Sequence, residues 1–308
     1  MLNFLYCFDE NYQVQAYVSI LSVLEKSSEK INVDMICNFN LVESSFPYTI
    51  RSHSMLNELR IHKINIDNVN LYNLNEAHVT EATFYRLFLE DYIENKKQFV
   101  TYLDCDILCV EDPSKLINET INELNKFNKI AAFNPEISKN EDIDYFINLD
   151  LTGDKYFNAG VMIFDSLKWK KFNIKEKSLT LIPVLKDKAI FWDQDILNKL
   201  FDNNYLEMKS ELNSRERKEI NENIVFHHFS GKHKPWTLKG FDQIYSNMFH
   251  EYYKKLYNKM FYIEIKNLRN SFRSLLIILF KNFRVSFKSK LVLFLYFVLH
   301  FLKKQFKT

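Results

Sequence analysis

The stretch FVTYLDCDIL, residues 99–108, places two acids, Asp104 and Asp106, inside an apolar run. The run as a whole, residues 99–110, predicts a buried strand, on which acids two positions apart project to the same side. An unpaired charge is costly among apolar residues, and two parallel carboxylates repel each other unless a cation lies between them. Mg²⁺ and Mn²⁺ bind such oxygen ligands and keep positions for diphosphate oxygens. Because a D-x-D tripeptide is common by chance, the surrounding sequence decides between a metal site and two solvated acids.

Strand and helix signals alternate on the N-terminal side of this stretch. Apolar runs or alternation predict strands at residues 2–8, 31–39 and 59–66, and helical spacing predicts helices at residues 14–24, 55–59 and 80–93. Strands that alternate with helices indicate a mostly parallel sheet covered on both faces. Ligands of such sheets bind at the carboxyl ends of the strands, where Asp9-Glu10 and Asp104–Asp106 fall. The expected class is α/β, with a site at this edge.

The pattern is weaker on the C-terminal side. Residues 114–150 are mixed and polar and predict a connecting region. Residues 156–164 predict a strand, residues 168–174 lead into a helical stretch, and residues 190–201 predict a short helix. A last strand is expected at residues 224–229, followed by a loop with Gly231 and Pro235.

A second group of polar residues follows that last strand, in the stretch HHFSGKHKPW at residues 227–236. A histidine at a strand end can complete a metal site as a nitrogen ligand, which favours Mn²⁺ over Mg²⁺. Gly231 lets the backbone approach a phosphate closely, and Lys234 can neutralise it as a point charge. Three histidines, a glycine and two lysines within ten residues therefore indicate a phosphate and metal site.

Composition narrows the class of protein. The chain has 308 residues, 47% of them hydrophobic and 26% charged, with only 4 Gly and 5 Pro, which excludes a disordered chain and favours one large domain with an appendage. The four cysteines lie in apolar segments without zinc-site spacing, so we expect buried, reduced thiols. The N-terminus has no basic region of the kind that starts a secretory signal, which predicts a protein that stays inside the cell.

The net charge of +2 is unevenly divided along the chain. Residues 262–308 contain ten Lys or Arg and one acid, a net +9, so residues 1–261 carry a net −7. An acidic body with a basic tail is not the pattern of a nucleic-acid-binding domain. The tail includes LVLFLYFVLHFL at residues 291–302, which is shorter than the roughly 18–20 residues of a membrane-spanning helix. Cations mixed with large apolar residues predict a basic amphipathic segment that binds an anionic membrane surface; a helix packed on the body is the alternative.

Six blocks occur in a fixed order over about residues 1–240: FDENY at 8–12, ATFYRL at 82–87, YLDCD at 102–106, YFNAGV at 156–161, DQDILN at 193–198 and HFSGKHKPW at 228–236. In these blocks the chain resembles family 8 of the retaining glycosyltransferases. It is most similar to the bacterial enzymes that add α-linked galactose or glucose to lipopolysaccharide or lipooligosaccharide. Any one block alone would be weak; together they are specific.

The resemblance implies a GT-A fold, a nucleotide-binding α/β sheet merged with an acceptor-binding half. The expected division is a GT-A catalytic domain at residues 1–260 and the basic amphipathic tail at residues 261–308. Asp104, Asp106 and His228 would hold Mn²⁺, with Mg²⁺ possible.

A UDP-sugar would be the donor. The resemblance implies that the nucleotide would contact the backbone of Cys7 and the side chains of Asp9, Asn11 and Tyr12. Gly231 and Lys234 would hold the diphosphate. The remaining donor-side residues are Cys105, His78, Arg86, Asn158, Ala159, Asp193 and Gln194.

Retention could proceed by front-face attack or through a covalent intermediate on Gln194 or Asp195. Arg86 would bridge the donor sugar and the acidic site. The expected reaction moves galactose or glucose to a lipid-linked saccharide at the cytoplasmic face of a membrane, to which the tail would bind. The same fold could instead act on another polysaccharide or on a protein glycan, or be a non-catalytic sugar-nucleotide-binding module. A nucleotidyltransferase is disfavoured, because the sequence has no Gly-rich loop near its N-terminus.

Overall fold

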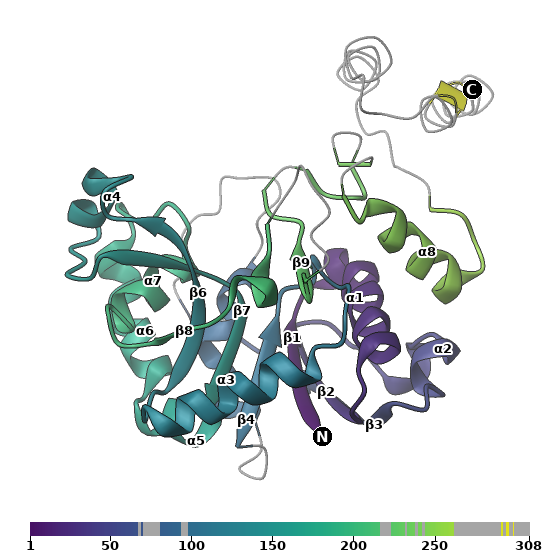
Figure 1. Cartoon of the computed structure of the whole chain (residues 1–308), viewed down its shortest axis with the longest axis horizontal. Coiled ribbons are helices and arrows are strands. Elements are labelled where there is room, and N and C mark those ends of the chain that lie inside the picture. Colours follow the sequence, from purple (N-terminus) through teal and green to yellow (C-terminus); the bar gives the residue numbers. More distant parts are fainter. Residues whose placement is uncertain are drawn as a thin grey trace. The chain divides into compact units, whose positions relative to one another are not determined.

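The structure is a computed structural model of the chain (Figure 1). It describes residues 1–66, 69, 81–93, 98–215, 223–231, 233–237, 240–241, 244–261, 291, 294–295 and 298. The chain divides into two compact units. The first comprises Met1–Ser214 and Glu222–His228, and the second comprises Arg215–Asn221 and Phe229–Thr308.

A seven-stranded sheet lies at the centre of the first unit. Its strands, in spatial order, are β3 (Leu56–Lys63), β2 (Ile31–Cys37), β1 (Leu2–Cys7), β4 (Phe99–Leu103), β7 (Lys155–Asp165), β6 (Ala131–Ser138) and β8 (Leu206–Glu207). β1 is parallel to β2 and β4, β2 is parallel to β3, and β7 is antiparallel to β4 and β6. The mostly parallel sheet is confirmed. The chain runs outward from β1 to β3 and then returns to the other side of β1, so β1 and β4 flank the point where strand order reverses.

Strand alternation gives each face of the sheet its own core. Tyr6 accepts a hydrogen bond from Ser19 of α1 (Gln13–Lys26) at 3.2 Å, and Phe4 meets Phe226 edge-on at 6.5 Å. This face is covered by α1, by α3 (Ser114–Lys126), which crosses in front of the sheet in Figure 1, and by the ribbon of β5 (Ile107–Cys109) and β9 (Phe226–His228).

Leu5 and Cys7 point to the opposite face and enter a larger aromatic core. That face is covered by the 3₁₀ helix η3 (Glu81–Asp91) and by α4 (Ile143–Asn148), α5 (Ser166–Lys171), α6 (Ile174–Leu185) and α7 (Asp193–Leu200). Short elements complete the first unit: η1 (Glu10–Tyr12), η2 (Glu43–Ser45), α2 (Tyr48–Arg51) and η4 (Ser210–Asn213).

The run predicted as one strand at residues 99–110 is two strands in different sheets, and this prediction was wrong. β4 ends at Leu103 and β5 begins at Ile107. Between them the chain turns: the Ile107 amide donates to the Asp104 carbonyl at 3.1 Å, and the Asp104 amide donates to the Gly160 carbonyl at 2.8 Å. The turn removes both acids from the apolar layer that their neighbours enter.

Two further predictions were wrong. Residues 55–59 do not form a helix, because β3 begins at Leu56 and pairs with β2, with Leu59 opposite Val33. Residues 114–150 are not merely a connection: they contain α3, β6 and α4. α3 buries only one narrow stripe, including Ile117, Thr120 and Leu124, and this explains why its sequence is so polar.

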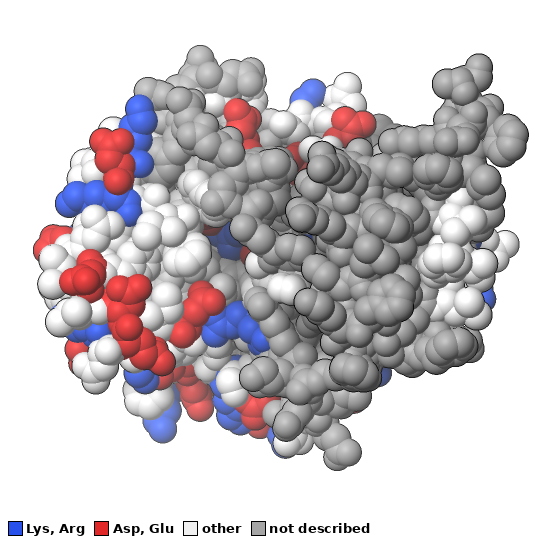
Figure 2. Space-filling view, turned by 90° about the horizontal axis from the view of Figure 1, so that it is seen from above, with Lys and Arg blue, Asp and Glu red and all other residues white. Residues whose placement is uncertain are grey.

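The second unit contains α8 (Ser246–Tyr257), which buries Phe249, Tyr252 and Leu256 at helical spacing. Phe249 packs against the ring of Trp236 at 5.3 Å. Among the described residues, no helix combines the length and apolar character needed to cross a bilayer. On the face shown in Figure 2, acidic and basic side chains are interspersed over the described surface.

Candidate functional site

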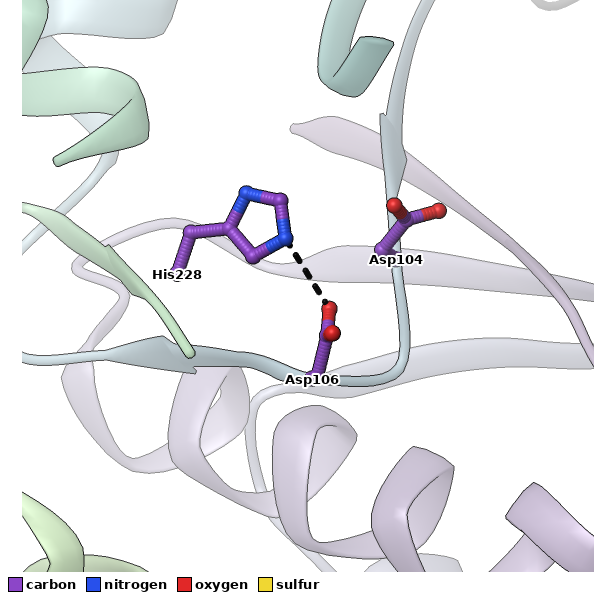
Figure 3. A group of neighbouring side chains, drawn as sticks. All are labelled: Asp104, Asp106 and His228. Carbon is purple, nitrogen blue, oxygen red and sulfur yellow. Dashed lines mark ion pairs between the residues drawn. The ribbon is translucent and has the colours of Figure 1, made fainter. Parts of the chain in front are cut away.

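The predicted metal ligands converge in the first unit. The β4–β5 turn carries Asp104 and Asp106, and β9 carries His228, which is paired in register with Ile107 (Figure 3). One ligand atom from each of the three side chains lies within 4.8 Å of the other two. His228 Nε2 is 3.3 Å from Asp106 Oδ1. Two carboxylates and an imidazole nitrogen facing one another are a donor set that fits Mn²⁺.

Gly160 on β7 makes room for this arrangement. A Cβ atom at Gly160 would lie 2.5 Å from Cε1 and 2.8 Å from Nδ1 of His228. Such approaches are far inside van der Waals contact, so β7 and the histidine of β9 can come together only because residue 160 lacks a side chain.

Arg86 of η3 joins the acidic turn to α7. Its Nη2 is 3.0 Å from Asp104 Oδ1, its Nε is 2.6 Å from Asp193 Oδ2, and its Nη1 donates to the Ala159 carbonyl at 2.6 Å. The guanidinium also lies over the Tyr102 ring, 4.9 Å from its centroid. Burial acts to lower the pKa of Arg86, but the attraction of Asp104 and Asp193 outweighs it and holds that pKa above its usual value.

Both carboxylate oxygens of Asp193 are engaged. Thr83 donates to Oδ1 at 2.7 Å, and Arg86 pairs with Oδ2. Burial raises the pKa of Asp193 to about 6, against the opposing effects of Arg86 and of the hydrogen bond from Thr83. The contacts of Asp193 therefore anchor Arg86.

Gln194, the next residue on α7, faces β7. The Ala159 amide donates to its Oε1 at 2.9 Å, and its Nε2 donates to the Tyr156 hydroxyl at 3.1 Å and approaches Glu136 Oε2 at 3.4 Å. Asn198, one turn further, accepts from the Phe157 amide at 2.8 Å. These contacts hold α7 against β7.

Asp195 has different surroundings. Its Oδ1 accepts hydrogen bonds from the hydroxyls of Tyr145 and, at 2.5 Å, Tyr156. Its Oδ2 accepts from the amides of Ile190 and Phe191 at 2.7 and 2.8 Å. The side chain is fully buried. These contacts give Asp195 a role in fixing the loop that precedes α7.

The predicted nucleotide contacts follow β1 at the sheet edge. Asp9 caps η1 and accepts from the amides of Asn11 and Tyr12 at 2.9 and 3.2 Å. Burial, followed by the charge of Asp106, raises the pKa of Tyr12. The ends of β1 and β4 thus bring both acidic clusters to one edge, where strand order reverses and open α/β sheets bind ligands.

Cys7 and Cys105 link the two strand ends, since the Cys105 thiol donates to the Cys7 carbonyl at 3.6 Å. Burial raises the pKa of both thiols. All four cysteines are buried and unbridged, which confirms the prediction of buried thiols. His78 lies outside the described residues. Gly231 and Lys234 belong to the second unit, in which Gly231 has a φ of 70° and the Lys234 carbonyl accepts from the Thr237 amide at 2.9 Å.

Two side chains that contact predicted residues could not be identified from the sequence. Glu136 on β6 accepts from Asn158 Nδ2 at 3.1 Å, and Asn213, in η4, lies 3.0 Å from His228 Nδ1. Both lie in stretches without periodic apolar residues, in a chain rich in Asn and Glu. Only their partners identify them.

Fold and site together define an α/β protein with two acids and a histidine that could hold a metal ion at the edge of its sheet. Residues 3–240 match glycosyl transferase family 8, and the chain belongs to this family. General stress protein A of Bacillus subtilis is 30% identical over 214 residues, 63% of this chain and 70% of the relative. Lipopolysaccharide 1,2-glucosyltransferase of Escherichia coli K12 is 27% identical over 253 residues, 76% of this chain and 72% of the relative. Lipopolysaccharide 1,3-galactosyltransferase of Salmonella typhimurium is 26% identical over 254 residues, 77% of this chain and 74% of the relative.

Solved structures are similar in fold. The galactosyltransferase LgtC, in complex with donor and acceptor sugar analogues, superposes with a TM-score of 0.71 at 22% identity, covering 83% of this chain and 96% of LgtC. Glycosyltransferase GlyE of Streptococcus pneumoniae gives 0.58 at 16% identity, covering 82% of this chain and 61% of GlyE. The likeness to LgtC confirms a GT-A-like α/β fold.

Proposed function

We propose that this chain transfers a hexose, galactose or glucose, from a UDP-sugar to a lipid-linked saccharide in lipopolysaccharide or lipooligosaccharide synthesis. The transfer retains the anomeric configuration and depends on Mn²⁺. The observation that carries the proposal is the convergence of Asp104, Asp106 and His228 at the sheet edge between β1 and β4 in a family 8 chain. The names of the Escherichia coli and Salmonella relatives support the hexose and the lipopolysaccharide acceptor.

The donor would lie across the carboxyl ends of β1 and β4. Asp9 holds the backbone of Asn11 and Tyr12 in place, so that these residues and the Cys7 carbonyl can receive the nucleotide. Asp104, Asp106 and His228 would hold Mn²⁺, which when bound supplies positive charge to the leaving diphosphate. Tyr102 donates to Asp104 Oδ1 at 2.7 Å, and Arg86 pairs with the same oxygen.

Arg86 orients the acidic turn and the sugar side of the site at once, because its three nitrogens contact Asp104, Asp193 and the Ala159 carbonyl. Gln194 contacts Ala159 of β7, the neighbour of Asn158 in the same strand. The side chains of Gln194 and Asn158 would contact the sugar. For a covalent route we assign the nucleophile to Gln194, because its Oε1 accepts one hydrogen bond, from the Ala159 amide, whereas Asp195 is fully buried and accepts two at each oxygen. Front-face attack would use Gln194 only to stabilise positive charge on the sugar.

The acceptor brings the proposed enzyme to a membrane. We assign residues 1–260 to the GT-A catalytic domain and residues 261–308 to a basic tail that binds the inner face of the cytoplasmic membrane. The net +9 of residues 262–308 supports this assignment.

The test is UDP release by the purified full chain with UDP-galactose or UDP-glucose, with Mn²⁺ or EDTA. We expect release with one donor, its loss in EDTA, and at least about a 100-fold loss in Asp106→Ala, because a metal supplies several kcal/mol to such a step. Asp144→Ala, an exposed acid on α4, is the matched control. Metal-independent release, or no binding of UDP with Mn²⁺, would refute the proposal. Transfer only to a protein or another polysaccharide would correct the acceptor.

A further inference from the structure

The imidazole of His228 can serve a cation through Nε2 only if that nitrogen carries its lone pair. In a neutral imidazole one ring nitrogen carries the proton, and the hydrogen bond made by the other nitrogen decides which. Nε2 faces Asp106, while Nδ1 lies 3.0 Å from Asn213 Oδ1. Since the two ends of an amide are exchangeable, the orientation of Asn213 must come from its other neighbours.

Asn158 supplies that orientation because it lies between two groups of fixed polarity. The Gly160 amide donates to Asn158 Oδ1 at 3.0 Å, and Asn158 Nδ2 donates to Glu136 Oε2 at 3.1 Å. A backbone N–H can only donate, and a carboxylate accepts. Both neighbours are therefore satisfied by one orientation of the Asn158 amide, with Oδ1 toward Gly160 and Nδ2 toward Glu136.

The orientation of the Asn158 amide determines the orientation of Asn213, which in turn determines which nitrogen of His228 must donate. Asn213 Nδ2 lies 2.9 Å from Asn158 Oδ1, an acceptor, so Asn213 must present its NH₂ group there. Its Oδ1 is then turned to His228 Nδ1, which must donate. Asn213 is 1% exposed, Asn158 7% and His228 6%, so water competes little for these bonds. Reversing either amide would place like polar atoms together in the interior and leave buried groups without a hydrogen bond, which is unfavourable.

We infer that Asn213 is a positioning residue: oriented by Asn158, it holds His228 as the Nδ1–H tautomer, with the Nε2 lone pair directed toward Asp106 and the cation. The contacts within the chain place a proton on Nδ1. The lone pair on Nε2, which faces the acceptor Asp106, requires a cation between the two groups and so rests on the proposed function. Partners of this kind behind a metal-bound histidine usually change metal affinity by about 10–100-fold.

The first test is the ¹⁵N NMR spectrum of the full chain, metal-free, with ¹⁵N-labelled histidine in alkaline buffer. The chemical shifts of protonated and unprotonated ring nitrogens differ widely, and His228→Gln identifies the signals. We expect Nδ1 of His228 to carry a proton, whether or not Nε2 is also protonated beside Asp106. An unprotonated Nδ1 would overturn the inference, whatever the activity.

Two substitutions at Asn213 separate positioning from packing. Asn213→Leu keeps the approximate volume and removes the acceptor, so we expect a mixture of tautomers and about 10–100-fold weaker binding of Mn²⁺ by calorimetry. Asn213→Asp still accepts from Nδ1–H, so it should keep the proton on Nδ1, at lower stability because a second acceptor then faces Asn158 Oδ1. Asn198→Leu is the matched control: it removes an equally buried asparagine that bonds to the Phe157 backbone and should leave the tautomer unchanged.

The outcomes distinguish this inference from the proposed function. The Nδ1–H tautomer without Mn²⁺ binding would uphold the role of Asn213 and refute the metal in the proposed function. Unchanged tautomer and unchanged affinity in a folded Asn213→Leu would overturn the inference while leaving the transferase intact. If Asn213→Leu does not fold, the wild-type spectrum and Asn213→Asp decide, and loss of the Nδ1–H tautomer in Asn213→Asp would contradict the role.

Discussion

At the scale of single residues, Arg86 has a buried acidic partner, Asp193, whose behaviour with pH differs from that of surface acids. Burial raises the pKa of Asp193 to about 6, whereas an unfolded aspartate has a pKa of about 3.9. Between these values the folded chain binds more protons than the unfolded chain, so Asp193 makes the free energy of unfolding fall as pH rises through this window. Above about 6 Asp193 is ionised and holds Arg86.

We expect the pH profile of kcat/KM to have an acid limb, that is, a loss of activity at low pH. kcat/KM for the donor should rise with pH through about 6 as Asp193 ionises and fixes Arg86. The measurement compares the pH profiles of the wild type, Asp193→Asn and Asp144→Asn. The limb should be lost in Asp193→Asn and kept in Asp144→Asn. An unchanged limb in Asp193→Asn would assign it to another group.

At the scale of elements, the sequence predicts strands and helices correctly where apolar residues recur with a clear period. The strands at residues 2–8, 31–39 and 156–164 and the helix at residues 14–24 correspond to β1, β2, β7 and α1. It fails at the β4–β5 turn, because apolar residues continue through residues 107–110 into the second sheet and hide the break. The two acids were therefore predicted correctly as neighbours, but for the wrong reason: a turn places them together. Asn213 and Glu136 could not be predicted, since their partners lie on other strands.

The approach of β9 to β7 gives an element-scale prediction. In Gly160→Ala the new Cβ would meet the His228 ring at 2.5 Å, so the ring must shift, and overpacking of this kind costs about 1–3 kcal/mol. We expect lower stability together with loss of Mn²⁺ binding, measured by thermal unfolding and calorimetry. Gly153→Ala is a matched control, because its Cβ would meet Asp202 at 2.9 Å outside the site. Similar loss of Mn²⁺ binding in both variants would contradict a local effect.

At the scale of the whole molecule, charge is divided along the chain rather than balanced within it. Residues 1–261 carry a net −7, and residues 262–308 carry a net +9. An anionic membrane repels an acidic body, so in the proposed function the attraction to the surface must come from the tail. Because each Lys near an anionic surface contributes about 1 kcal/mol, the tail lysines test this division directly.

We expect the triple substitution Lys303→Glu, Lys304→Glu and Lys307→Glu to weaken binding of the full chain to phosphatidylglycerol vesicles by at least about 100-fold, because removing three such charges costs about 3 kcal/mol. Vesicle sedimentation measures it, and raised salt should weaken wild-type binding in the same direction. UDP release with a soluble acceptor should be unchanged, because these lysines lie outside the family match at residues 3–240. The control reverses three exposed lysines of the first unit, Lys170, Lys171 and Lys186. Equal weakening by both triple variants would mean that vesicle binding depends on the net charge of the whole chain and not on the tail. The proposed division into a catalytic body and a membrane-binding tail would then have to be abandoned.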